Sequence, residues 1–420
     1  MDTRRIDRNK TKIPTDSAIR GHIGPADMPE QKPEQEPEQT EEMPRIFSKK
    51  KATLAIFATL ALLLIFSEAF GLVSIFGQRS LDFSLRGQID ILPGSQIATT
   101  PAGIFIAAHS YLRLLDVGGS EIFRHNYTLD SPWIVSRGNY AAAIGSSRLA
   151  AHIYSGSGLS FSVDSPSPIL NFSLAKNGYF ATITHSGGNY YIHIYNRYGR
   201  INRGRHVDEN IVPMAIDVSH DGRFLAISYV DINDAAINSL VKFFFLREDD
   251  YLANHYIDGI FAMSIENRDQ IIGSLHFMEN NRLLAISESR IFMIDPQDGA
   301  RTIWEISLSN RIRQIVAEDD WFAVIYGEHI AGMPPVGQQN NIAAYSADGN
   351  RIFSANLSGI QGIDSFGGNL LIFTDTESRL YSVRSGQLLW QHATMATSSA
   401  LIGDRGLVEI IGQQVLLYSN

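Results

Sequence analysis

The chain of 420 residues contains no cysteine. This absence excludes disulfide bonds, thiolate metal ligands, a cysteine nucleophile and a lipid-modified N-terminal cysteine. Charged residues are also scarce, at 19%, and lysine almost disappears after residue 76, where only Lys176 and Lys242 remain. Residues 77–420 carry 24 Lys and Arg against 33 Asp and Glu, a net charge of −9. Because this average field repels a polyanion, nucleic acid is not an expected partner.

Residues 1–44 have few large apolar side chains and include the stretch PEQKPEQEPEQTEEMP. Such a segment cannot bury enough surface to offset the entropy of the chain, so it is predicted to be a disordered tail. The tail is either a solvated spacer or a docking segment for a cytoplasmic partner. A basic juxtamembrane segment follows at residues 45–51, with Arg45 and three consecutive lysines, Lys49 to Lys51.

Residues 52–76 are 25 residues with a single charge, Glu68. About 20 apolar residues suffice to cross a bilayer, so this stretch is predicted to be a transmembrane helix, with Glu68 at its far interface. The lysines that precede it place the N-terminus in the cytoplasm and the bulk of the chain outside, as a single-pass protein of the cell membrane. The alternative is a signal peptide cleaved after Ala69.

Residues 77–420 contain a repeat of about 40 residues. Apolar runs such as YAAAIGS, RFLAISYV and RLLAISES each follow a Gly, Asn or Asp, and these turn residues recur every 35 to 59 positions. Those residue types tolerate the backbone of tight hairpin turns. The turn residues are Gly103, Gly138, Gly178, Gly222, Asn281, Asp320, Gly368 and Gly406. This period predicts an all-β fold, an extracytoplasmic β-propeller of eight blades, with seven as the alternative.

The last repeat ends at Asn420, before a fourth strand could form. A strand-like segment without a repeat of its own, residues 81–87 (LDFSLRG), is predicted to pair with the C-terminal blade and close the ring. This closure would place the face that carries the tight turns near the bilayer, because residues 81–87 follow the predicted membrane helix so closely.

Three connections are longer than the others: Val230–Ser239, Asp258–Asp269 and Gly327–Asn341. The first and third are expected to join second to third strands, and the middle one to join two blades, so all three would lie on the face opposite the tight turns. Long loops on a rigid scaffold often carry function. The candidate residues for binding a ligand or partner are Asp231, Asn233, Asp234, Glu328 and His329.

Two segments, RIFMIDPQDGARTIW and RLYSVRSGQLLW, resemble the blades of quinoprotein-type propellers. The resemblance implies that Trp304 and Trp390 pack over a neighbouring blade. In the catalytic members of that family a quinone and a calcium ion are bound, often beside a vicinal disulfide. The disulfide is impossible here and the other ligands cannot be assigned, so no cofactor is expected.

A metal site is not expected either. Asp231, Asn233 and Asp234 are similar to the start of a calcium loop, but the loop lacks the glycine at its sixth position, and Lys242 stands where the twelfth-position glutamate belongs. The twelve histidines show no zinc-site spacing, and no catalytic motif stands out. No catalytic residue is therefore assigned.

The segment SHDGRFLAISYVDINDAAINSLVKFFFL, after the tail and the helix, resembles a family of bacterial single-pass membrane proteins described only as a domain of unknown function. The resemblance covers roughly residues 45–420 and implies no activity. The expected function is a non-catalytic binding or scaffolding module for an envelope protein or a cell-wall glycan. The alternatives are a quinoprotein-like or glycan-active enzyme and a transmembrane sensor.

Overall fold

The computed structural model describes residues 81–207, 210–232, 238–246, 260–268, 270–327 and 339–420. The predicted tail, basic segment and membrane helix (1–44, 45–51 and 52–76) lie outside these ranges. Within them, no helix has the length and apolar character needed to cross a bilayer. The described chain is almost entirely β-strand, with one short 3₁₀ helix, η2 (Pro296–Asp298).

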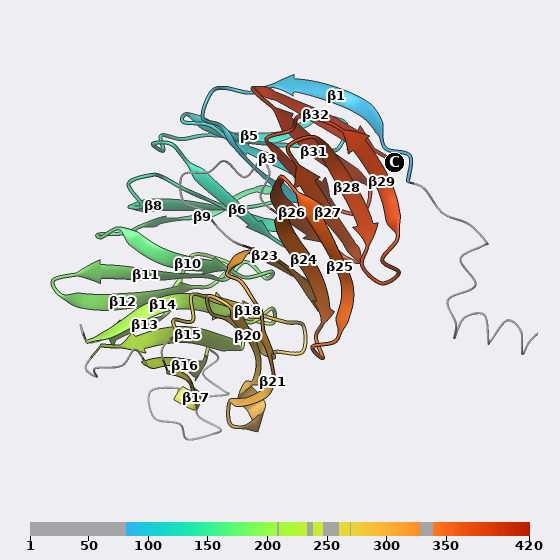
Figure 1. Cartoon of the computed structure of the whole chain (residues 1–420). Helices are drawn as coiled ribbons and strands as arrows, with labels where there is room; N and C mark the ends of the chain where they lie inside the picture. The colour runs from blue at the N-terminus through green and yellow to red at the C-terminus, as the bar shows by residue number, and fades with distance from the viewer. Residues whose placement is uncertain (1–80, 208–209, 233–237, 247–259, 269, 328–338) are drawn as a thin grey trace, which may run out of the picture. The chain divides into compact units, whose positions relative to one another are not determined.

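The strands form eight antiparallel sheets of four strands each, as the repeat predicts, and each sheet is one blade (Figure 1). Blades one to four contain β2 (Gln96–Thr100), β3 (Gly103–Ala107), β4 (Tyr111–Leu115), β5 (Glu121–Asn126); β6 (Trp133–Arg137), β7 (Tyr140–Ile144), β8 (Ala150–Ser155), β9 (Gly158–Asp164); β10 (Ile169–Leu174), β11 (Phe180–Ser186), β12 (Asn189–Tyr195), β13 (Ile201–Val207); β14 (Ile211–Val218), β15 (Phe224–Asp231), β16 (Asn238–Phe245) and β17 (Ile260–Arg268). Blades five to eight contain β18 (Ser274–Phe277), β19 (Leu283–Ile286), β20 (Arg290–Asp295), β21 (Arg301–Ser307); β22 (Ile312–Ala317), β23 (Trp321–Gly327), β24 (Gln339–Ser346), β25 (Arg351–Ser358); β26 (Ile360–Phe366), β27 (Asn369–Thr374), β28 (Glu377–Ser382), β29 (Leu388–Ala393); β30 (Ser398–Ile402), β31 (Gly406–Ile411), β32 (Gln414–Ser419) and β1 (Ser84–Asp90).

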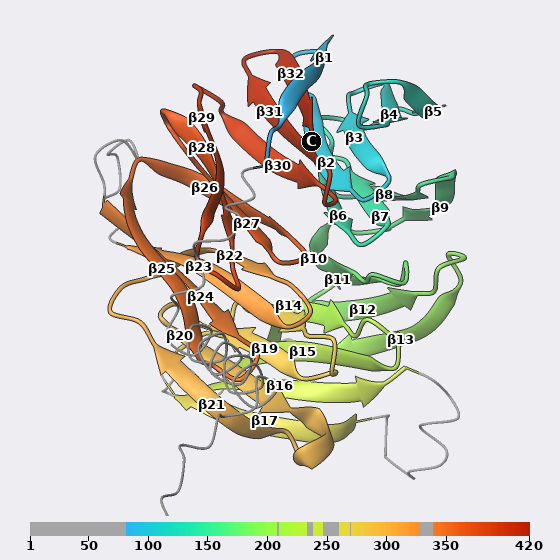
Figure 2. The same cartoon turned by 90° about the vertical axis from the view of Figure 1, so that its right-hand side faces the viewer.

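The blades succeed one another around a central axis (Figure 2). First strands of successive blades contact each other, among them β2 with β6, β10 with β14, and β26 with β30, and the contact of β30 with β2 completes the ring. The second strands of the blades are buried over most of their length, whereas most fourth strands alternate between exposed and half-buried residues. The fold is therefore an eight-bladed β-propeller.

The hydrophobic core is divided among the junctions between blades. The described residues form eight clusters, and each cluster draws its members from two successive blades. One cluster joins Ile104 and Ile106 of blade one to Val415 and Leu417 of blade eight, so the first and last blades share a core like any other pair. Because both faces of each sheet are covered, the second strands consist of short runs of apolar residues.

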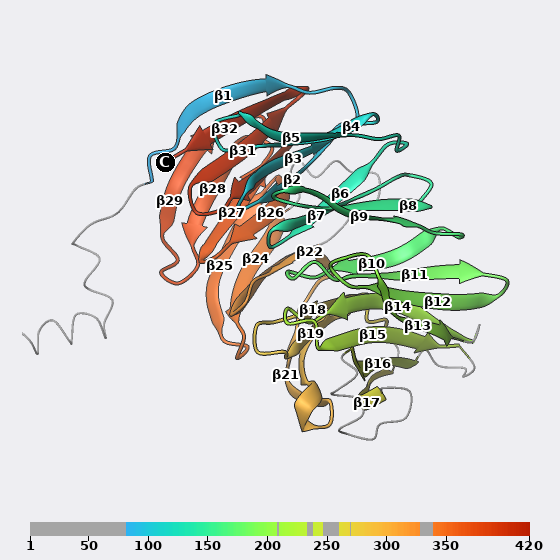
Figure 3. The same ribbon diagram turned by 180° about the vertical axis from the view of Figure 1, so that it is seen from behind.

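The N-terminal strand closes the ring, as Figures 1 and 3 show. β1 pairs antiparallel with β32, from Ser84 opposite Ser419 to Asp90 opposite Gln414. The sequence places this strand at residues 81–87, and the structure places it three residues later. Leu81 and Phe83 instead dock on blade seven: the Leu81 amide donates to the Leu389 carbonyl at 3.0 Å, and Phe83 meets Trp390 edge to face at 5.6 Å.

Every outermost strand has a shift in register close to its start. The shift lies between Leu114 and Leu115 in blade one, between Ala344 and Tyr345 in blade six, and at the corresponding position of the other six blades. A bulge twists an exposed edge away from the regular ladder. The eight free edges are in this way protected against pairing with another chain.

Aromatic side chains on the fourth strands pack against the next blade. Phe123 stacks on Tyr154 of blade two, and Trp390 lies 6.3 Å from Tyr418 of blade eight. Trp304 stacks on Phe322, and its Nε1 donates to the Ala347 carbonyl at 3.0 Å. The two tryptophans of the quinoprotein-like segments are thus contacts between blades.

The turn between first and second strands uses a positive φ in most blades. Gly178 has φ +84°, and a Cβ atom there would lie 2.7 Å from the ring of Tyr140, so the position requires glycine. Asn281 takes φ 60° in the same turn of blade five. In blades seven and eight the positive φ belongs to Gly367 and Gly403, not to the predicted Gly368 and Gly406.

One predicted connection is wrong. The range Asp258–Asp269 does not join two blades, because most of it is β17, the fourth strand of blade four. In this strand the polar residue Ser264 is buried and the hydrophobic residue Met263 is exposed. The strand therefore lacks the apolar pattern by which the sequence predicts the others. The long connection is 246–259, between β16 and β17, and it starts and ends on the tight-turn face.

Candidate functional site

The face opposite the tight turns, here called the long-loop face, carries the connections from second to third strands and from blade to blade. It exposes a set of large apolar side chains in a part of the surface otherwise rich in Ser, Gly and Pro. They are Leu92, Trp133, Leu149, Leu170, Ile232, Ile271 and Met395. Near the opposite face, Tyr198 of a tight turn is exposed, and so are apolar residues at the starts of fourth strands, namely Ile122, Leu159, Ile201, Ile352 and Leu388.

Trp133 is the largest member of this set. It is the first residue of β6, 48% exposed, and its ring meets Phe172 of β10 edge to face at 5.2 Å. Arg148 of the same blade donates from Nη1 to the Leu170 carbonyl at 3.2 Å, which holds the two blades together beside the tryptophan. Trp and Arg are the residues over-represented where proteins bind partners strongly.

Of the five predicted binding residues, the structure describes Asp231. Asp231 is the last residue of β15 and is half-buried, opposite Asn238 of β16 and Ile211 of β14. Asn233 and Asp234 follow it outside the described residues. Glu328 and His329 also lie outside them, directly after Gly327, where β23 ends. Of the five, Asp231 is therefore the one whose position the described chain gives.

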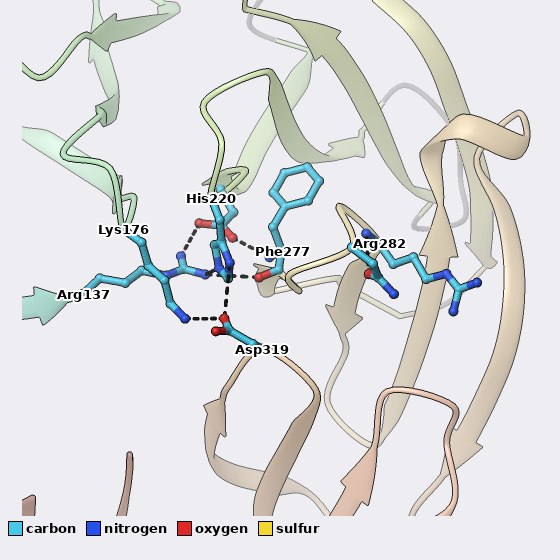
Figure 4. Close-up of polar contacts among 8 residues, drawn as sticks. Arg137, Lys176, His220, Phe277, Arg282 and Asp319 are labelled. Atoms are coloured by element: carbon cyan, nitrogen blue, oxygen red, sulfur yellow. Dashed lines mark hydrogen bonds and ion pairs between the residues drawn. The ribbon is translucent and has the colours of Figure 1, made fainter. Parts of the chain in front are cut away.

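A second polar site crosses the axial channel near the tight-turn face, and sequence reasoning missed it. We call Arg137, Lys176, Asp217, His220 and Asp319 the cross-channel network (Figure 4). They come from blades two, three, four and six. Arg137 is the last residue of its first strand, and Lys176, His220 and Asp319 each lie in the turn that follows a first strand. The sequence signal is therefore a charged or imidazole side chain at equivalent positions of separate repeats.

Asp217 is the centre of this network. The residue is 1% exposed, and its Oδ1 accepts from Arg137 Nη1 at 2.7 Å and from Ser173 Oγ at 2.6 Å. Its Oδ2 accepts from the Phe277 amide at 2.7 Å. One side chain of blade four thus bonds to blades two, three and five. A buried carboxylate is tolerable because all of these donors compensate its charge.

His220 bridges two charges of opposite sign. Its Nε2 lies 3.3 Å from Arg137 Nη2, and its Nδ1 lies 3.4 Å from Asp319 Oδ1. A guanidinium can only donate, so Nε2 must be the accepting nitrogen and Nδ1 must carry the proton. Burial, Arg137 and Lys176 lower the pKa of His220 to about 4. Lys176 completes the crossing by an ion pair with Asp319.

Two further carboxyl groups continue the polar ring into blades seven and eight. Glu318 Oε1 accepts from Ser365 Oγ at 2.8 Å, and Asp364 Oδ2 accepts from the Leu401 amide at 2.7 Å. Burial raises the pKa of Glu318 and raises that of Asp364 to about 6. The described residues contain no group of three His, Cys, Asp or Glu side chains placed to bind a metal ion. The hydrogen bonds and ion pairs of this region connect blades that face each other across the axis.

The fold and its two faces define the protein as an eight-bladed β-propeller. A family model of unknown function, DUF5711, matches residues 95–402, and the chain therefore belongs to this family. No curated protein matches the sequence.

Solved structures are similar to this chain at low sequence identity. Sqt1 from Chaetomium thermophilum is 13% identical, with a TM-score of 0.53 over 81% of this chain and 98% of its own. The propeller of Dos1 is 12% identical, with a TM-score of 0.50 over 80% and 95%. BamB from Moraxella catarrhalis is 14% identical, with a TM-score of 0.49 over 81% and 100%.

Proposed function

We propose that this protein is a membrane-anchored, extracytoplasmic propeller that acts without catalysis, binding an envelope protein or a cell-wall glycan on its long-loop face. The observation that carries the proposal is Trp133, 48% exposed at the start of β6 on that face, next to Arg148, which is bonded to the exposed Leu170 of the next blade. An exposed tryptophan beside an arginine on a rigid scaffold is typical of interaction surfaces.

The apolar run at residues 52–76 and the lysines before it support the anchor and the orientation. β1 begins opposite Ser419, on the tight-turn face, only a few residues after that run. In this arrangement the tight-turn face lies toward the bilayer and the long-loop face points away from it, free to meet a partner.

Affinity capture from solubilised envelopes tests the proposal, with the full-length chain as bait. Trp133→Ala combined with Leu170→Ser should lose a partner that the parent chain captures. Tyr198→Ala is the matched control, because Tyr198 is an aromatic side chain 67% exposed on the opposite face. Capture that survives the double substitution, or that is lost with Tyr198→Ala, would contradict the assigned face.

Membrane topology is tested separately by protease treatment of intact spheroplasts. The propeller should be cleaved or released, and a tag placed before residue 44 should stay protected. Protection of both parts would refute the extracytoplasmic placement and leave the binding face as a separate question.

A further inference from the structure

The cross-channel network works only while His220 is neutral. Arg137 donates to Nε2 at 3.3 Å, and this bond requires a lone pair on that nitrogen. A second proton would occupy the lone pair and place an imidazolium against the guanidinium. The bond would be replaced by a repulsion between like charges in a buried place.

The groups around His220 make this repulsion strong. Arg137 reaches it from β6 and Lys176 from the turn after β10, and both are cations. The carboxylates that face it are Asp217 of β14 and Asp319 of the turn after β22, and both already have cationic partners. His276 of β18 is a further titratable group near Asp217 and Arg137, bonded through Nε2 to Ser274 Oγ at 2.9 Å.

We propose that the cross-channel network is an acid-sensitive lock, which ties blades two, three, four and six together across the axis at neutral pH and releases their tight-turn ends when His220 gains a proton. The core clusters between blades contain no member of the network. Release would therefore separate the first-strand ends at the channel and uncover Ala175, which lies just after β10 at the turn end of its cluster, while the other apolar contacts between the blades remain. This device is independent of the partner proposed above.

The pH window follows from the direction of the shift. The pKa of His220 is lowered from 6.5 to about 4 in the closed state, so the open state binds the proton more strongly. The stability of the closed lock is complete above about pH 6.5 and is lost as the pH falls toward 4. Between pH 7 and pH 5 the open fraction should rise on the order of tenfold.

A single engineered thiol measures this opening, because the chain has no cysteine of its own. Ala175→Cys places a thiol on a fully buried residue next to Lys176, in the full-length protein in detergent. The rate at which this thiol reacts with a pyridyl disulfide, a reagent active at acid pH, is measured at each pH. Dividing it by the rate for the chain unfolded in urea at the same pH removes the intrinsic pH dependence of the reaction. Ala143→Cys, buried in β7 away from the network, reports global unfolding.

The decisive comparison adds His220→Gln to the Ala175→Cys chain. A glutamine can accept from Arg137 and donate to Asp319 but cannot titrate. The parent thiol should become on the order of tenfold more reactive from pH 7 to pH 5, whereas the His220→Gln thiol should change less than twofold.

Three results would overturn the lock. They are a flat parent curve, an equal rise in the presence of His220→Gln, and an equal rise at Ala143→Cys, which would mean unfolding of the whole ring. If His220→Gln lowers the melting temperature, the pH dependence of the Ala175→Cys thiol and of the Ala143→Cys control still tests the lock. His276→Gln in the same background shows whether the second imidazole contributes to the rise.

Discussion

At the scale of single residues, the interior of this propeller combines a fully compensated carboxylate with one that is poorly compensated. Asp217 accepts three hydrogen bonds, one of them from a guanidinium. Asp364 accepts from the backbone amides of Leu401 and Ser365 and lies near the carboxyl group of Glu318, and its burial raises its pKa. The two aspartates stand at equivalent places in blades four and seven and have opposite consequences for stability.

Asp364→Asn should stabilise the protein at neutral pH. The pKa of Asp364 is raised from 3.8 to about 6 in the folded state, so its favourable contribution exists below pH 3.8 and is lost as the pH rises through 6. Removing the charge should raise the free energy of unfolding at pH 7.5 by about 1 to 2 kcal/mol, after a cost for one mismatched amide bond.

Urea unfolding at pH 7.5 and pH 3.5 checks this expectation. The variant should be more stable than the parent at the higher pH and no more stable at the lower pH. Asp404→Asn, on an exposed turn residue, is the control and should show no such reversal. A variant that is less stable than the parent at both pH values would contradict the assignment.

At the scale of elements, the contact between a fourth strand and the next blade depends on a glycine. A Cβ atom at Gly349 would lie 3.0 Å from the ring of Trp304, and the residue has φ +81°. Gly299 has φ +66° with no atom within 4 Å of its ideal Cβ. Both glycines have a positive φ, but only a side chain at Gly349 would contact a tryptophan.

Gly349→Ala should therefore cost more than Gly299→Ala. The control should lose about 1 kcal/mol from the positive φ alone, and Gly349→Ala should lose about 2 to 3 kcal/mol because the indole must also move. Chemical denaturation of both variants gives the difference. Equal losses would show that Trp304 yields without cost and does not fix the junction of blades five and six.

The sequence predicts most elements of this fold, and the exceptions have physical causes. Second strands are buried on both faces, so runs such as Phe224–Asp231 are continuous and easy to recognise. β17 is missed because it buries Ala262 and Ser264 and exposes Met263. The closing strand is predicted three residues too early because Leu81 and Phe83 look like strand residues. They are apolar because they contact blade seven.

The candidate sites are less predictable than the strands. Trp133 is a single aromatic residue whose exposure depends on its place at the start of β6. Bonded members of the cross-channel network are separated by up to 143 residues, as for Lys176 and Asp319, and the closed ring brings them together. Alignment of the repeats would have placed them at one level of the channel, but not shown which pairs meet.

At the scale of the whole molecule, the ring is only as stable as its closure. Phe83 is nearly buried between blades seven and eight, against Trp390, and leads directly into β1. Because each blade depends on two neighbours for its core, loss of the closing contact should weaken all eight junctions as one unit.

Phe83→Ala should lower the free energy of unfolding by about 3 kcal/mol or more while the unfolding transition stays single. Leu85→Ala is the matched control on the same segment, since Leu85 is exposed, and it should cost less than about 0.5 kcal/mol. Thermal melting followed by far- and near-ultraviolet circular dichroism measures both. Two separate transitions for Phe83→Ala would mean that the blades unfold independently.

The pairing of β1 with β32 also sets the order in which a growing chain can fold. Ser84 Oγ donates to the carbonyl of Ser419, 335 residues later. At about 5 to 20 residues per second, β1 leaves the ribosome roughly 20 to 70 seconds before its partner exists. Its sequence, SLRGQID, with mostly exposed or half-buried side chains and a bulge at Arg86, suits a strand that must wait in water without pairing elsewhere. Blades one to seven can form in turn as the chain emerges, and the ring becomes closed only once β32 has been synthesised.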